Sequence, residues 1–279
     1  MRQKTKFGLV LFIGTLLFVS CSDLRTKVSK KTPDERKAKE LLHKMGAAHG
    51  IANWDKLATY TVTFEDEFFG KIGNNAKPYP ESNTQFELDY IPGTFDGRMT
   101  FKGGEWDGNV WGMQSWNTYE LNAEGKTEFK ENKDANFWVP TYQYFIEFPS
   151  RIQEATAFAY AGERTIDGIA CEGIIASWNT TKPQRKTDQY LIWIAKDTKR
   201  IYKLEYTIRE LYSFLTGAAY FKDYKNYDGI YLPSKLPVES NLSKNGWLHE
   251  MRIIDFTANK VEKDALRPNK DLDQMGDEK

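Results

Sequence analysis

Three consecutive acidic residues are the nearest approach in this sequence to an acid/base catalytic group: Glu65, Asp66 and Glu67. On an extended strand, Glu65 and Glu67 project from one face about 7 Å apart, a separation that would suit the two carboxylates of an inverting glycosidase. Carboxylates on an exposed strand face are common, so the pattern favours a solvated face over catalysis. Asp66 falls on the opposite, apolar side between Phe64 and Phe68, which requires either a β-bulge or a polar group lining a cavity.

The other reactive side chains are few. His43, His49 and His249 are the only histidines. The first two lie on roughly opposite faces of a predicted helix, so they do not share a metal-facing side, and we expect no metal and no cofactor. The last turn of that helix favours the charged form of His49. Cys171 sits in an apolar strand with no activating base nearby, which predicts a buried, inert thiol.

Aromatic residues, 14% of the chain, give the strongest indication of a ligand. They suit a pleated sheet that buries large rings on one side, and they would equally suit an apolar cavity. The candidate ligand-binding residues are Trp111, Met113, Trp138, Tyr142, Phe145 and Trp193. Core packing is the alternative for each of them. An open surface cluster of Trp106, Trp111 and Trp116 would instead favour stacking on sugar rings.

The first 20 residues predict the compartment. Arg2, Lys4 and Lys6 form a basic start, and residues 7–19 form an apolar run. That run is too short for a transmembrane helix, which needs about 20 residues, and is typical of a signal peptide. The boundary Phe18-Val19-Ser20-Cys21 resembles the bacterial lipobox, so we expect residues 1–20 to be removed and Cys21 to carry lipid.

Composition narrows the partners of the mature chain. Losing three basic residues with the signal peptide changes the balance from 39 basic and 39 acidic residues to 36 against 39. This faintly acidic chain argues against nucleic acid as a partner. With Cys21 acylated, Cys171 has no disulfide partner. Residues 21–32 are polar and lysine-rich after the cysteine, which predicts a flexible tether.

The helices and strands that must position these residues are predicted from the spacing of apolar residues along the sequence. Residues 33–49 predict an amphipathic helix, with Thr32 as its cap and Gly50 as its end. Residues 138–152 predict a short apolar helix that Pro149 breaks. Between and after the helices, alternating patterns separated by Asp-Gly turns predict antiparallel strands near residues 60–68, 86–90, 99–101, 110–113, 168–178, 190–195, 201–207, 219–224 and 248–256.

The succession of these features resembles a known family. It includes Leu41-Leu42-His43-Lys44-Met45 closing on His49-Gly50, the mid-chain apolar helix, and the turn motifs Ile166-Asp167-Gly168, Trp193-Ile194-Ala195-Lys196-Asp197 and Tyr227-Asp228-Gly229-Ile230-Tyr231-Leu232-Pro233. This order is similar to the LolA/LolB-like superfamily of lipoprotein carriers and their relatives of unknown function. The resemblance implies a mainly β (α+β) fold: a bent, half-open antiparallel β-barrel with an N-terminal amphipathic helix and a short helix on the concave side. We expect one domain over residues 33–279.

Function is predicted from these observations together. The leading hypothesis is an outer-membrane lipoprotein facing the periplasm, with surface exposure left open, that binds a hydrophobic or amphiphilic ligand such as a lipid or acyl chain without catalysis. Its expected partners are the membrane, through the lipid on Cys21, and that ligand; the expected state is a monomer. One alternative is an accessory glycan-binding lipoprotein. Another is a hydrolase, favoured only if Glu65 or Glu67 faces a cleft with a second carboxylate opposite.

Overall fold

A computed structural model describes residues 21–28, 34–121, 124–243 and 246–276. The predicted signal peptide and the predicted helix cap at Thr32 lie outside the described residues. Among the residues described, no helix combines the length and apolarity needed to cross a bilayer.

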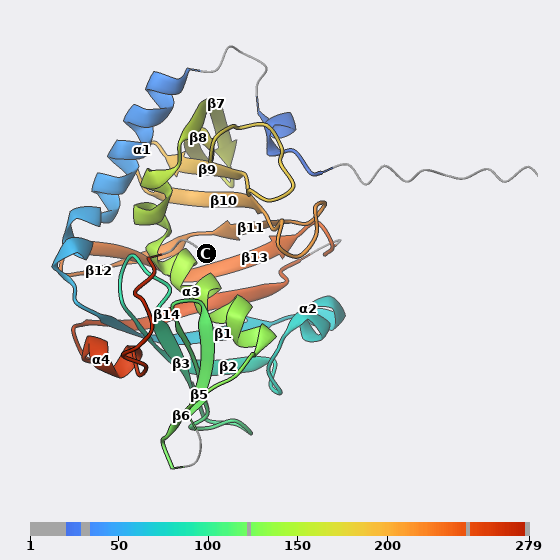
Figure 1. The fold of residues 1–279 in the computed structure, drawn as a ribbon. Helices are drawn as coiled ribbons and strands as arrows, with labels where there is room; N and C mark the ends of the chain where they lie inside the picture. The colour runs from blue at the N-terminus through green and yellow to red at the C-terminus, as the bar shows by residue number, and fades with distance from the viewer. Residues whose placement is uncertain (1–20, 29–33, 122–123, 244–245, 277–279) are drawn as a thin grey trace, which may run out of the picture.

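The described strands form one 14-stranded antiparallel sheet. Its order is β6-β5-β4-β3-β2-β1-β14-β13-β11-β10-β9-β8-β7, with β12 paired to β13. The sheet bends strongly but does not close, so β6 and β7 are its two edges (Figure 1). This confirms the predicted mainly β, half-open architecture. The strands are β1 (Tyr60–Phe68), β2 (Asn83–Tyr90), β3 (Gly97–Lys102), β4 (Val110–Gln114), β5 (Asn117–Leu121), β6 (Thr127–Phe129), β7 (Ala157–Ile166), β8 (Ile169–Ser177), β9 (Tyr190–Ala195), β10 (Ile201–Thr207), β11 (Thr216–Tyr220), β12 (Lys222–Tyr227), β13 (Ile230–Ser240) and β14 (His249–Ala258).

Two long helices cover the concave face of the sheet (Figure 1). They are α1 (Glu35–His49) and α3 (Lys133–Arg151); the shorter helices are η1 (Leu24–Lys27), η2 (Ile51–Lys56), α2 (Gly70–Ala76), η3 (Ile152–Glu154) and α4 (Lys263–Leu266). The cap of α1 is Asp34, whose side chain accepts a hydrogen bond from the Lys37 amide at 2.9 Å. Gly50 ends the helix at φ 73°, as predicted, because a left-handed residue favours glycine.

The mid-chain helix differs from the prediction. It runs from Lys133 to Arg151, so Pro140 and Pro149 lie inside it and do not bound a short segment. Proline removes one backbone donor, but packing on the concave face supplies enough contacts to continue the helix through both positions. The prediction of a short helix broken at Pro149 was therefore wrong.

The two faces of the sheet hold separate apolar clusters. Alternate residues of β9 divide between them: Ile192 and Ile194 join the large concave cluster with α1 and α3, whereas Leu191 and Trp193 join a smaller cluster on the opposite, convex face. The smaller cluster includes Leu24, which is only 1% exposed. Successive strand side chains point to opposite faces, so α1 and η1 cover opposite sides of the sheet.

The described part of the predicted tether is ordered against the sheet. Residues 22–28 carry η1, capped by the Asp23 side chain, and bury Leu24. The prediction of a flexible tether is wrong for this stretch because one leucine and several side-chain hydrogen bonds fix it to the convex face. Residues 29–32 lie outside the described residues.

Candidate functional site

Helix α3 fills the hollow of the half-barrel with aromatic side chains. Trp138 and Tyr142 contact each other with ring centroids 5.5 Å apart. Trp138 also contacts Phe68 of β1 at 5.7 Å, and Tyr142 contacts Phe64 of the same strand at 4.8 Å. The helix is therefore packed into the concave face along one side of β1.

The structure brings five of the six predicted ligand residues to this face. Trp111, Met113 and Tyr142 belong to the concave cluster, and the half-buried Trp138 and Phe145 pack against it. Met113 and Tyr142 are fully buried, so in this structure they pack the core. The sixth residue, Trp193, lies on the convex face and donates a hydrogen bond to Glu205 at 3.1 Å, so it is not brought together with the others.

A buried polar chain joins α3 to the strands. Asp66 is fully buried, as its position in the strand predicted, and accepts hydrogen bonds from Tyr142 at 2.7 Å and from His249 at 2.7 Å. The Tyr142 hydroxyl also contacts that of Tyr79 at 2.7 Å. Burial, followed by the nearby Asp66 charge, raises the pKa of Tyr142 and of Tyr79 well above the ordinary tyrosine value. The hydroxyls stay protonated, and both oxygens of Asp66 are engaged in holding the helix.

A second buried polar group fixes the C-terminal half of α3. Glu147 forms an ion pair with Arg151 at 2.9 Å, with both side chains under 5% exposed. The Glu147 carboxylate also accepts hydrogen bonds from the hydroxyl of Tyr60 at 2.7 Å and from the amide of Gly93 at 3.1 Å. This group was not predicted from the sequence; its signal was an acid and a base four residues apart on one face of the helix, preceded on that face by the buried Gln143.

A cavity of about 580 Å³ opens beside the first turn of α3. Its walls come from the β5–β6 hairpin, the start of α3 and residues 210–211 of the β10–β11 loop. The apolar lining is Trp116, Phe129, Phe137 and Leu211, and the polar lining includes Lys130, Lys133, Asn136 and Glu210. The volume lies within the range of small-molecule sites, and the lining is more polar than is usual for them. Trp116 was named from the sequence only as part of a possible glycan-binding cluster, and the other lining residues were not predicted, because they come from segments far apart in the sequence.

The candidate catalytic carboxylates have a structural partner. Arg252 of β14 bridges Glu65 and Glu67 at 2.7 Å each and pairs with Glu250 at 2.7 Å. The two carboxylates therefore form an ion-pair cluster on the strand face, and neither lines the cavity beside α3. This arrangement does not meet the condition set for a hydrolase.

The tryptophans that would favour a glycan site are not gathered on an open surface. Trp106 contacts Trp111 at 5.5 Å, but Trp111 is only 7% exposed. Trp116 packs instead on Phe95 at 5.0 Å. Within the described residues, no group of three or more His, Cys, Asp or Glu side chains is arranged to hold a metal ion.

These features define a class of protein: an open antiparallel half-barrel whose concave face is filled by a helix and bordered by a cavity. Solved structures of this class resemble the chain. A domain from Vibrio parahaemolyticus named for outer membrane lipoprotein sorting is 14% identical, covers 84% of this chain and 98% of its own, and has a TM-score of 0.54. A LolA superfamily protein from Nitrosomonas europaea is 11% identical, with 82% and 96% covered and a TM-score of 0.53.

A DUF1329 family protein from Desulfovibrio piger is 13% identical, covers 84% of this chain and 97% of its own, and has a TM-score of 0.52. No protein-family model matches the sequence, and no curated protein matches it. The chain has the LolA/LolB-like fold, as its order of motifs predicted.

Proposed function

We propose that this protein is a lipoprotein of the cell envelope that binds a hydrophobic or amphiphilic ligand, such as a lipid or acyl chain, without catalysis. The observation that carries the proposal is the cavity beside α3 in a LolA-like half-barrel. Its apolar side chains suit an alkyl chain, and its polar side chains, two lysines, two glutamates and an amide among them, suit a polar head group. The half-buried Trp138 and Phe145 remain proposed contacts deeper along the helix.

The proposal extends to the anchor and the compartment. Cys21 is the acylated residue, the membrane is the outer membrane with the protein facing the periplasm, and the protein is a monomer. Support for the anchor comes from the lipobox-like sequence around Cys21, and fractionation of the two membranes tests the compartment.

A fluorescent fatty acid tests the ligand site. Leu211 is 44% exposed and lines the cavity, so Leu211→Asp places a charge in its wall without disturbing the core. We expect the folded variant to lose most of its probe affinity. The matched control is Ile254→Asp, because Ile254 is 46% exposed and lies on β14, outside the cavity.

Two results would contradict the site. The first is a folded Leu211→Asp variant that binds the probe as tightly as the wild type and the control. The second is a wild-type protein that binds no acyl probe at all; glycan binding is then the alternative to test, on a glycan array, although its tryptophans are not gathered on an open surface.

A further inference from the structure

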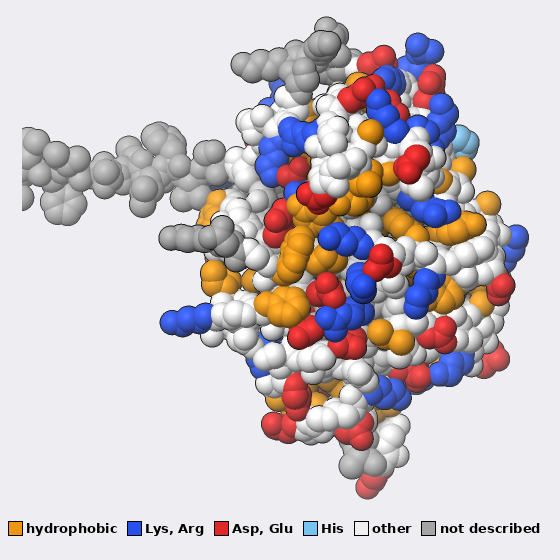
Figure 2. All heavy atoms as spheres, turned by 180° about the vertical axis from the view of Figure 1, so that it is seen from behind, with side chains coloured by type: hydrophobic (Ala, Val, Ile, Leu, Met, Phe, Trp, Pro, Cys, Tyr) orange, Lys and Arg blue, Asp and Glu red, His pale blue; other side chains and the backbone are white. Residues whose placement is uncertain are grey.

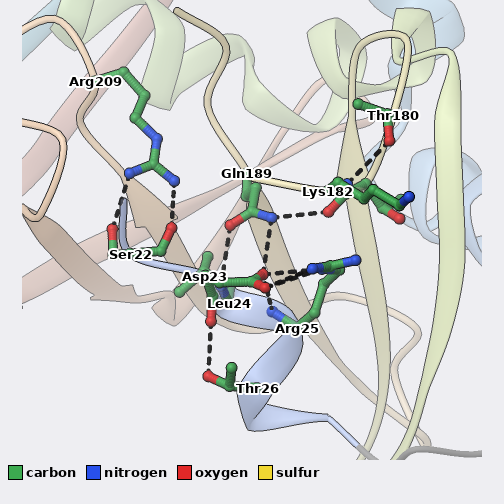
Figure 3. Close-up of polar contacts among 10 residues, drawn as sticks. Ser22, Asp23, Leu24, Arg25, Thr26, Thr180, Lys182, Gln189 and Arg209 are labelled. Carbon is green, nitrogen blue, oxygen red and sulfur yellow. Dashed lines mark hydrogen bonds and ion pairs between the residues drawn. The ribbon is translucent and has the colours of Figure 1, made fainter. Parts of the chain in front are cut away.

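The first residues after Cys21 are fixed to the segments that connect the strands at one end of the sheet (Figure 3). The amide and hydroxyl of Ser22 both donate to the carbonyl of Ser213, at 3.0 and 3.2 Å. The guanidinium of Arg209 donates to the hydroxyl of Ser22 at 3.0 Å and also to its carbonyl. Two residues further on, the amide of Leu24 donates to the side-chain oxygen of Gln189 at 3.0 Å. These bonds span more than 160 positions in the sequence, so they fix the segment to the folded domain.

The fixation continues along the segment and leaves Cys21 little freedom. Lys27 pairs with Glu205 of β10, and its carbonyl accepts a hydrogen bond from Arg164 at 3.0 Å. Leu24 occupies the convex cluster. Cys21 is the neighbour of Ser22 in the sequence, and consecutive Cα atoms are about 3.8 Å apart. Because Ser22 is hydrogen-bonded to the β10–β11 loop, Cys21 lies beside that loop. A lipid on Cys21 would start at the surface of the domain.

Strand pairing places that loop on one end of the sheet. Thr207 pairs with Thr216, Gly217 with Ser240, and His249 with Phe68. The chain segments that follow these strand ends therefore share one side of the molecule, on the right of Figure 1. We call this side the anchor rim; it comprises residues 178–189, 208–215, 241–243 and 246–248, together with α2.

The anchor rim carries most of the exposed apolar side chains. Of the ten large hydrophobic residues exposed in the described chain, six belong to it: Ile72, Leu211, Tyr212, Phe214, Leu242 and Trp247. The rings of Tyr212 and Phe214 stack at 5.5 Å although they are 60% and 41% exposed. Figure 2 shows hydrophobic side chains along the margin where the described chain begins. Contiguous apolar exposure of this kind marks a protein or membrane contact.

The charges on the rim favour a membrane. Lys182, Arg185 and Lys186 are exposed in the segment next to the anchor, against a single exposed carboxylate, Glu210, in the neighbouring loop. Asp188 of the same segment is engaged with Thr207 and the Arg209 backbone. Aromatic rings with nearby cations are the composition that binds at a bilayer surface, where each basic residue strengthens binding to anionic lipid by roughly fivefold.

We propose that the anchor rim is a membrane-docking surface, held by the fixed segment after Cys21 against a bilayer that contains anionic lipid. This inference rests on the proposed acylation of Cys21. The domain then lies on the membrane in one orientation, with the Tyr212–Phe214 pair in the head-group region. Leu211 belongs both to the rim and to the wall of the cavity, so the rim borders the proposed ligand site.

Depth-dependent quenching tests the orientation. The acylated chain is purified from membranes, its acylation is confirmed by mass spectrometry, and a fluorophore is attached at Tyr212→Cys. The matched control is Ile169→Cys, because Ile169 is the exposed first residue of β8, at the opposite end of that strand from the anchor rim. Cys171 does not react, since it is fully buried and burial raises its pKa to about 11. Both proteins are placed in vesicles of phosphatidylcholine and phosphatidylglycerol with brominated acyl chains.

We expect the fluorescence at position 212 to be quenched and that at position 169 to be unchanged. Equal and weak quenching at both positions in an acylated protein would overturn the docking surface while leaving the anchor intact. An unacylated Cys21 would overturn the anchor and, with it, this inference. The charge-reversed variant Lys182→Glu, Arg185→Glu and Lys186→Glu should lose quenching at position 212; unchanged quenching would remove the role of anionic lipid.

Discussion

Tyr142 of α3 belongs to a buried hydrogen-bonded group with Asp66 and Tyr79. Removing its hydroxyl should lower the free energy of unfolding more than removing a tyrosine hydroxyl at the surface. In Tyr142→Phe, the Asp66 carboxylate loses the 2.7 Å bond from Tyr142, and the hydroxyl of Tyr79 loses its neighbour. A hydrogen bond to a buried charge contributes about 1.5–3 kcal/mol, so we expect the free energy of unfolding to fall by about 2–3 kcal/mol. For a domain of this size that lowers the melting temperature by roughly 4–12 °C.

The measurement is urea unfolding followed by circular dichroism, with the slope against urea concentration checked for constancy. The control is Tyr202→Phe, because Tyr202 donates to Asp167 at 2.9 Å in an exposed position, where water replaces the bond and the loss should be well below 1 kcal/mol. If the free energy of unfolding falls no more in Tyr142→Phe than in Tyr202→Phe, the hydrogen bonds among Asp66, Tyr142 and Tyr79 do not hold α3 against the sheet. Our explanation of how α3 is fixed in the concave face would then be wrong.

Three further predictions concern titration, anchoring and redox state. Burial lowers the pKa of His49 to about 4, below its unfolded value of 6.5. The contribution of His49 to the free energy of unfolding is therefore constant above pH 6.5 and is lost as the pH falls from 6.5 towards 4. In acid titrations the wild type should lose about 3 kcal/mol more over this range than the variant His49→Gln, which has no group that titrates there. Cys21→Ala should be folded yet unlabelled by a palmitate analogue; equal labelling of the wild type and the variant would show that Cys21 is not the acylated residue. Cys21 and Cys171 form no disulfide, so reductant should leave the melting temperature unchanged; a marked fall would contradict this.

Much of the fold could be predicted because its signals are local. Alternation along β1 and the spacing on α1 follow from side-chain periodicity, and Gly50 ends α1 where a left-handed residue is required. Parity along β1 also placed Asp66 among apolar residues before any partner was known. The partners themselves, His249 and Tyr142, could not be predicted because they are 183 and 76 positions away in the sequence.

The errors share one cause, which is tertiary packing that overrides a local preference. The helix end favours a charged His49, yet the ring is buried between the Met45 carbonyl at 2.8 Å and the Tyr224 hydroxyl at 3.0 Å, so it is neutral. Pro149 lies within a helix that it was predicted to break, because the concave face supports the helix. Leu24 is a single apolar residue in a polar stretch and gives no periodicity, so its docking on the convex face could not be predicted.

Mass spectrometry of lipids that copurify with the intact protein tests the central claim most directly. Our account predicts an acyl lipid bound in addition to the chains attached at Cys21, displaced by a fluorescent fatty acid and lost from the folded Leu211→Asp variant while the Ile254→Asp control retains it. A wild-type protein that carries no lipid beyond its anchor, and that takes up no acyl probe, would contradict it.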